Sequence, residues 1–216
     1  MITLGIEGAL GGFSAAVARN DEIASAAALE GNVALEAGLS AVHSVMQSAG
    51  VSIAALDRLA VGIGPGSFTG LRITIAYAKS LAQAWRLPLV GISSFDVLEY
   101  GFNIERVLTV VVGRPGVISA RYRSAGAVAC ASGPTLEALR TVLEGIPPAA
   151  LDVLGAPEDA LAALAEAGFA VKSLSAKVAP SAAAVALAGS SLPPAATFHE
   201  VRADYGEAPA AKVPKF

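Results

Sequence analysis

Along the first half of the chain, short apolar runs of strand length precede and follow longer stretches whose apolar residues recur at helical spacing. Three runs come first, and the last two are separated by Asn20-Asp21, a pair typical of a hairpin turn. A helical stretch over 33–49 follows and ends at Gly50, a good helix C-terminal residue. We predict strands over 2–7, 13–19, 22–29, 56–63 and 88–92, a second helix over 69–85 and a short helix ending near Gly101.

The second half repeats this order of elements, with Arg114-Pro115-Gly116 and Ala125-Gly126 as turns between its first strands. The predicted strands are 106–112, 117–123, 127–131, 152–154 and 169–174, and the predicted helices are 135–143, 158–167 and 181–190. Three antiparallel strands followed by strand–helix alternation predict a mixed sheet with helices on both faces. The fold class is therefore α/β with two similar domains, 1–103 and a smaller one over 104–216, whose last helix is free to pack back on the first domain.

The helices over 33–49 and 69–85 carry narrow polar stripes and wide apolar faces. A helix that lies on a sheet needs only one apolar stripe. Two interpretations stay open: an alanine-rich sequence lowers polarity on every face, or these two helices also meet another subunit through small residues. On the second interpretation, the expected partner contacts are Leu35, Gly38, Ala41, Val42 and Val45 on the first helix, and Phe68, Arg72, Ile75, Ala78, Lys79 and Ala82 on the second.

Composition narrows the classes of function. Apolar residues make up 54% of the chain and charged residues 15%, with a formal net charge of −3, so unaided nucleic-acid binding is disfavoured. The basic concentrations are limited to Arg114, Arg121 and Arg123 and to the pair Lys212 and Lys215. A single cysteine, Cys130, and two distant histidines, His43 and His199, argue against a disulfide or zinc site. With no long apolar run or signal peptide in view, we expect a cytoplasmic protein without a membrane span.

The glycine-rich segment over 62–72 joins a predicted strand to a predicted helix. Its backbone and the helix N-terminus suit an anion, which Gly64, Gly66, Ser67, Thr69 and Gly70 would contact. The segment lacks the Gly-Lys-Ser/Thr ending of a P-loop, so a purely structural turn and a partner surface with Phe68 at its tip remain alternatives. Either Ser67 or Thr69 is expected to cap the helix, because serine and threonine side chains accept hydrogen bonds from the N–H groups of its first turn. A role as nucleophile is not favoured, since no histidine lies nearby in the sequence to activate either hydroxyl.

The run Gly64-Pro65-Gly66-Ser67-Phe68-Thr69-Gly70-Leu71-Arg72-Ile73, with Leu87-Pro88-Leu89-Val90-Gly91-Ile92-Ser93 after it, resembles the signature of the TsaB (YeaZ) family. The resemblance implies two actin-like, ribonuclease-H-like domains and a part in making threonylcarbamoyladenosine on the tRNA base next to the anticodon. It implies a TsaD-like transferase as the catalytic partner, joined by a TsaE-like ATPase. The same helical face would form a homodimer when the chain is alone, and tRNA would be contacted only indirectly.

The chain departs from the family pattern at two strand ends, where actin-like ATPases carry aspartates. The first strand typically ends Ile-Asp-Thr but here ends Ile6-Glu7-Gly8, and an Asp-Ala-Arg stretch appears as Val112-Gly113-Arg114. Such aspartates position magnesium and water in actin-like ATPases, so independent hydrolysis is not expected, and Glu7 is the one residue considered for a metal. We expect a scaffold subunit without catalytic residues or a stably bound cofactor, with ATP or ADP at most at an interface. The alternative is a small actin-like ATPase or kinase that uses the glycine loop for phosphate.

Overall fold

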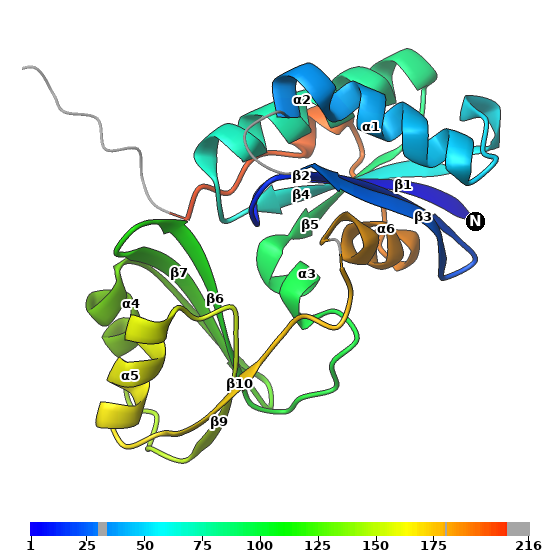
Figure 1. Cartoon of the computed structure of the whole chain (residues 1–216). Coiled ribbons are helices and arrows are strands. Elements are labelled where there is room, and N and C mark those ends of the chain that lie inside the picture. Colours follow the sequence, from blue (N-terminus) through cyan, green and yellow to red (C-terminus); the bar gives the residue numbers. More distant parts are fainter. Residues whose placement is uncertain (30–33, 180, 207–216) are drawn as a thin grey trace, which may run out of the picture.

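A computed structural model describes residues 1–29, 34–179 and 181–206, and within them the strands form two mixed five-stranded sheets (Figure 1). The first sheet has the order β3-β2-β1-β4-β5. Its strands are β1 (Ile2–Glu7), β2 (Phe13–Arg19), β3 (Glu22–Leu29), β4 (Arg58–Gly64) and β5 (Leu89–Ser93). The first three strands are antiparallel neighbours, whereas β4 and β5 run parallel to β1, as the element order predicts.

The second sheet, in the order β10-β9-β6-β7-β8, has the same topology. Its strands are β6 (Val107–Arg114), β7 (Val117–Ser124), β8 (Ala127–Pro134), β9 (Ala150–Leu154) and β10 (Ala170–Leu174). Antiparallel pairing joins β6, β7 and β8, and parallel pairing joins β6, β9 and β10. The repeat inferred from the sequence is thus a repeat of structure, while the boundary at residue 103 stays a prediction.

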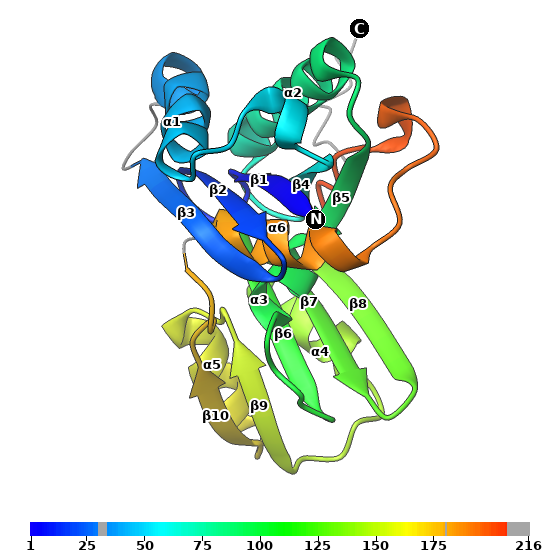
Figure 2. The same ribbon diagram turned by 90° about the vertical axis from the view of Figure 1, so that its right-hand side faces the viewer.

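The helices cover the sheets in layers. On one face of the first sheet lie α1 (Ala34–Ser48) and α2 (Phe68–Trp85), and on its other face lie α3 (Ser94–Glu99) and α6 (Ser181–Ser191) (Figures 1 and 2). The second sheet is covered by α4 (Thr135–Val142) and α5 (Glu158–Glu166), and the 3₁₀ turns η1 (Ile53–Ala55) and η2 (Phe198–Glu200) complete the elements of the described chain. The predicted helix start at Val33 and the pair Lys212 and Lys215 lie outside the described residues.

The C-terminal helix α6 is a core element of the first half. It packs on β1, β2 and β4, and nearly all of its residues are buried. Its backbone approaches the sheet closely at Gly5, where an added Cβ would lie 2.7 Å from Ala186 N and 2.9 Å from Ala186 Cβ. At its C-terminal end, Arg58 Nη1 donates to the carbonyl of Gly189 at 3.1 Å and to that of Leu192 at 2.7 Å. Because helix C-terminal carbonyls lack partners within the helix, Arg58 fixes this end on the sheet.

Candidate functional site

The glycine loop lies at the junction of β4 and α2, where the sequence places it. Ser67 is the N-cap of α2, and its side-chain oxygen accepts from Gly70 N at 3.2 Å. The cap therefore falls on the first of the two hydroxyl residues considered, whereas Thr69 is exposed on the first turn. The peptide between Gly64 and Pro65 is cis. The hydrogen bond from Gly70 N to Ser67 explains why a serine stands directly before the first residue of α2.

The backbone of the glycine loop is packed against the chain itself. An added Cβ on Gly70 would collide with Gly8 O, and one on Gly66 would collide with Ala9 O. Ser67 N donates to Ala9 O at 2.8 Å, which joins the loop to the turn after β1. On the other side, an added Cβ on Gly64 would collide with the carbonyl of Asp204. Three of the glycines considered for phosphate contact are therefore required for close packing within the chain.

Phe68, at the start of α2, belongs to an exposed cluster with Arg72 and Tyr205. The Phe68 side chain is 48% exposed, and Arg72 Cζ lies 3.8 Å from the centre of its ring. The ring of Tyr205 lies 5.0 Å from that of Phe68, centre to centre, at 43°. Phe68 and Arg72 are thus on the surface, as a partner contact requires. The neighbouring Tyr205 was not anticipated, since nothing in the local sequence indicates that pairing.

Glu7, at the end of β1, is buried and fully engaged by groups of this chain. Its Oε1 accepts from Ala9 N at 2.6 Å, and its Oε2 accepts from Ser181 Oγ at 2.9 Å. Leu10 N donates to the same carboxylate at 3.2 Å, and Gly62 leaves room for the side chain on the neighbouring strand. Burial raises the pKa of Glu7, and the hydrogen bonds that it accepts oppose this rise. Glu7 therefore holds the N-terminal end of α6 on the first sheet.

The second strand end, considered for an ATPase acid, carries Gly113, which is exposed on β6. Among the described residues, no group of three or more His, Cys, Asp or Glu side chains is arranged to hold a metal ion. The chemistry that Glu7 performs here is hydrogen bonding to two backbone amides and a serine hydroxyl. These contacts account for a carboxylate at this place.

Most of the small and apolar residues expected to contact a partner are in the core instead. This part of the expectation is corrected for Gly38, Ala41 and Val45 of α1 and for Ile75, Ala78 and Ala82 of α2, whereas Val42 is 3% exposed but lines the groove between the two helices. They pack against the first sheet and the neighbouring helix, because small residues let both helices approach closely. Gly38, for example, lies against the rings of Phe13 and Tyr77. Leu35 is 65% exposed and Lys79 is half-buried, so these two remain accessible together with Phe68 and Arg72.

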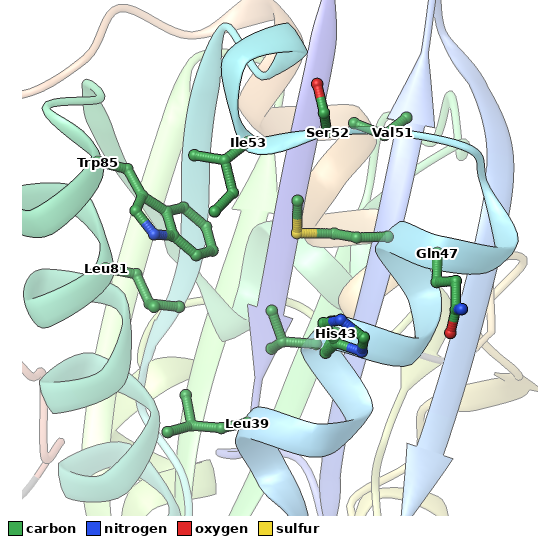
Figure 3. A pocket seen from close by; sticks show the side chains of 10 residues that line it. Leu39, His43, Gln47, Val51, Ser52, Ile53, Leu81 and Trp85 are labelled. Carbon is green, nitrogen blue, oxygen red and sulfur yellow. The ribbon is translucent and has the colours of Figure 1, made fainter.

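A groove of about 520 Å³ runs between α1 and α2 and opens to solvent. Leu81 and Trp85 of α2 point across it toward Leu39 and His43 of α1, and Ile53 of η1 lies at one end (Figure 3). Leu39 is 49% exposed and Ile53 46%. None of the described residues that line it is charged; they are Leu39, Val42, His43, Met46, Gln47, Val51, Ser52, Ile53, Leu81 and Trp85. The apolar stripe through Leu39 and Met46 is visible in the sequence, but the contribution of η1 is not.

Two of the arginines considered for nucleic acid are engaged at the junction of the two halves. Arg121 Nη1 lies 2.7 Å from Asp96 Oδ1 on α3, and Arg123 Nη2 lies 3.0 Å from Glu99 Oε2 at the end of the same helix. Arg121 also lies over the ring of Phe95 at 5.0 Å. Their guanidinium groups therefore serve packing between α3 and β7, which does not support a phosphate-binding role.

The duplicated mixed sheets define the class of protein, that of the actin-like ATPase fold. YeaZ from Pseudomonas aeruginosa matches 94% of this chain and 100% of its own, with a TM-score of 0.72 and 20% identity. The ROK hexokinase of Thermus thermophilus matches 87% of this chain and 97% of its own, with a TM-score of 0.50 and 15% identity. At these identities the likeness concerns the fold.

The family follows from the sequence matches. A family model described as "TsaD: tRNA N6-adenosine threonylcarbamoyltransferase" matches residues 35–191. The tRNA threonylcarbamoyladenosine biosynthesis protein TsaB of Escherichia coli is 36% identical over 81 residues, which cover 36% of this chain and 35% of that protein. The chain belongs to the TsaB (YeaZ) family, and it aligns with about a third of this relative's length. No helix in the described part of the chain is long and apolar enough to cross a membrane.

Proposed function

We propose that this chain is a non-catalytic subunit in tRNA threonylcarbamoyladenosine biosynthesis that binds a TsaD-like transferase through the α1–α2 groove. The observation that carries the proposal is an uncharged groove of about 520 Å³ with partly exposed Leu39 and Ile53 on its walls. Apolar side chains that converge on one opening are typical of a protein contact surface. The relatives' names support the pathway, and the exposed apolar groove supports this place of contact.

The energetics favour a helix or apolar ridge of a partner in this groove. Covering the exposed half of a leucine side chain contributes on the order of 1 kcal/mol, and several such groups lie together here. Trp85 adds a large, partly buried ring, the kind of residue that carries binding energy at the centre of interfaces. Because no charged side chain among the lining residues has to lose water, the cost of closing the groove is low.

The polar groups at the glycine loop support a subunit that does not hydrolyse nucleotide. Glu7 is occupied by three internal donors, and Gly113 places no acid at the corresponding strand end. Magnesium-dependent phosphoryl transfer needs carboxylates that reach the metal. On this proposal the isolated chain holds no nucleotide stably, and ATP or ADP binds where the transferase meets the chain.

The proposed complex and the proposed homodimer both use the α1–α2 groove. The transferase supplies the catalytic groups and the tRNA contacts, and a TsaE-like ATPase joins the pair. In the absence of the transferase, two copies cover their grooves against each other and form a homodimer. The complex works in the cytoplasm, where its tRNA substrate is.

The experiment that tests this function is rescue of tRNA modification in a strain depleted of the chain. We expect the wild-type chain to restore threonylcarbamoyladenosine, measured by mass spectrometry of tRNA nucleosides, and Leu39→Glu to fail. Leu136→Glu is the matched control, because Leu136 is also an exposed helical leucine, at 57%, but lies on α4. Unchanged modification after depletion contradicts the function, and so does measurable ATP turnover by the isolated wild-type chain.

A further inference from the structure

The last described residues of the chain, 201–206, pass over the glycine loop, far in sequence from the elements that they touch. Val201 is buried in the core of the first half. Two residues further on, Ala203 still packs on that core, and Asp204 N donates to Ile63 O at 2.7 Å. Figure 1 shows this segment, in red, running from the region of α2 toward the end of the second sheet near β7.

The same segment reaches the second sheet. An added Cβ on Gly206 would collide with Ser119 Oγ on β7 and would lie 3.2 Å from Ser132 Oγ on β8. It would lie equally close to Pro65 Cβ of the glycine loop. Residue 206 therefore lies close to the glycine loop and to strands β7 and β8. Its positive φ of 71° suits a glycine at this close approach.

A second observation places the segment beside β8. Burial raises the pKa of the Cys130 thiol, the guanidinium of Arg121 lowers it, and the carboxylate of Asp204 raises it again. Cys130 is exposed on β8, so Asp204 lies near enough to act on a group of the second sheet. On the outer side, the ring of Tyr205 lies against Phe68.

We propose that residues 201–206 form a strap that covers the glycine loop at Gly64 and Pro65 and links the loop to the second sheet, so that any ligand or partner group reaching the Gly64 backbone must first displace it. The strap lies where Gly64 would otherwise expose its backbone. It is fastened by one backbone hydrogen bond, one ring contact and the approach of Gly206. Asp204, Tyr205 and Gly206 are all exposed in part, so the strap is attached less firmly than the core strands.

The strap is separate from the α1–α2 groove. The groove is lined by residues of α1, η1 and the C-terminal half of α2, whereas the strap contacts the opposite end of α2 at Phe68. Displacing the strap leaves the groove's lining residues in place. A chain without the strap should still bind its partner through the groove, which makes failure of the strap proposal distinguishable from failure of the proposed function.

The test compares two shortened chains by hydrogen–deuterium exchange. One ends at Ala203 and lacks the outer strap; the matched control ends at Gly206 and lacks only residues beyond the described part. We expect amides over 63–70 to exchange at least about tenfold faster in the chain that ends at Ala203. Equal exchange in the two chains overturns the proposal, because the strap then does not cover the loop.

The thiol of Cys130 gives an independent readout in the full chain. Asp204→Asn in the full chain removes a charge that raises the pKa of the thiol and adds no terminal carboxylate, so we expect the thiol to react faster with Ellman's reagent near neutral pH. Gly206→Val in the full chain tests the link to β7 without shortening, since its side chain collides with Ser119 Oγ. It should speed exchange over 63–70 as well. An unchanged thiol rate in Asp204→Asn, or wild-type exchange in Gly206→Val, contradicts the strap.

Discussion

Arg121 on β7 and Glu99 at the end of α3 form an ion pair across the junction of the two halves, with Arg121 Nη2 2.9 Å from Glu99 Oε1. Glu99 also accepts from Thr109 Oγ1 at 2.6 Å and from Arg123 Nε at 3.0 Å. Its side chain is 9% exposed and that of Arg121 is 15% exposed. One carboxylate thus joins α3 to both β6 and β7 and pairs with two guanidinium groups, of which that of Arg121 also pairs with Asp96.

Glu99→Gln should lower the free energy of unfolding by about 2–3 kcal/mol, because it leaves Arg123 without its carboxylate and Arg121 with Asp96 alone. Asp96→Asn is the control: Asp96 pairs with the same Arg121, but its side chain is 50% exposed, so the loss should be about 1 kcal/mol or less. Urea denaturation of both variants measures the difference. Equal losses for the two variants would show that the buried pairing at Glu99 does not hold the junction.

Gly5→Ala should destabilise the chain severely, by about 3 kcal/mol or more, since the new methyl group would overlap backbone and side-chain atoms of Ala182 and Ala186 in α6. Neither partner is the flexible end of a long side chain, so relief requires the helix to move. Gly113→Ala on β6 is the matched control, because no described atom lies within 4 Å of its added Cβ. Its thermal unfolding should stay close to that of the wild type; a similar loss in both variants would contradict the close α6 contact.

Glu7 should make the chain's stability depend on pH in a defined direction. Because burial raises its pKa above the ordinary 4.5, the folded chain binds this proton more tightly than the unfolded chain does. The resulting stabilisation is complete below about pH 4.5 and is lost as pH rises through the raised pKa of the folded state. Glu7→Gln lacks this loss, so its stability relative to wild type should increase with pH over that window. Urea unfolding at a series of pH values measures it, and a constant or falling difference would be inconsistent with a buried, raised carboxyl.

The order of elements could be predicted from the sequence because each apolar run shows its period and each turn carries a residue suited to it. Asn20 and Asp21, for instance, both have positive φ in the β2–β3 hairpin, and Gly50 has it after α1. The sequence leaves the helix cap open between Ser67 and Thr69, and the hydrogen bond from Gly70 N to Ser67 Oγ decides for Ser67.

The surface of the candidate site could be predicted only in part. An alanine such as Ala78 suits a partner interface and the chain's own sheet equally well, and only the packing distance between α2 and the sheet decides between them. Glu7 was visible as a departure from the family, but its hydrogen bond to Ser181 comes from a helix of the other half of the sequence. Contacts of this kind, like that of Tyr205 with Phe68, depend on tertiary packing that carries no local signal.

Isothermal titration calorimetry with the purified cognate transferase measures directly whether the α1–α2 groove binds it. Leu39→Glu would place a carboxylate in the uncharged groove, so we expect its Kd to rise at least about tenfold, which corresponds to ~1.4 kcal/mol. Leu136→Glu, on α4, should bind like the wild type, and both variants should keep the wild-type unfolding temperature. Wild-type affinity in folded Leu39→Glu, or equal weakening in Leu136→Glu, would contradict binding of the transferase through the α1–α2 groove.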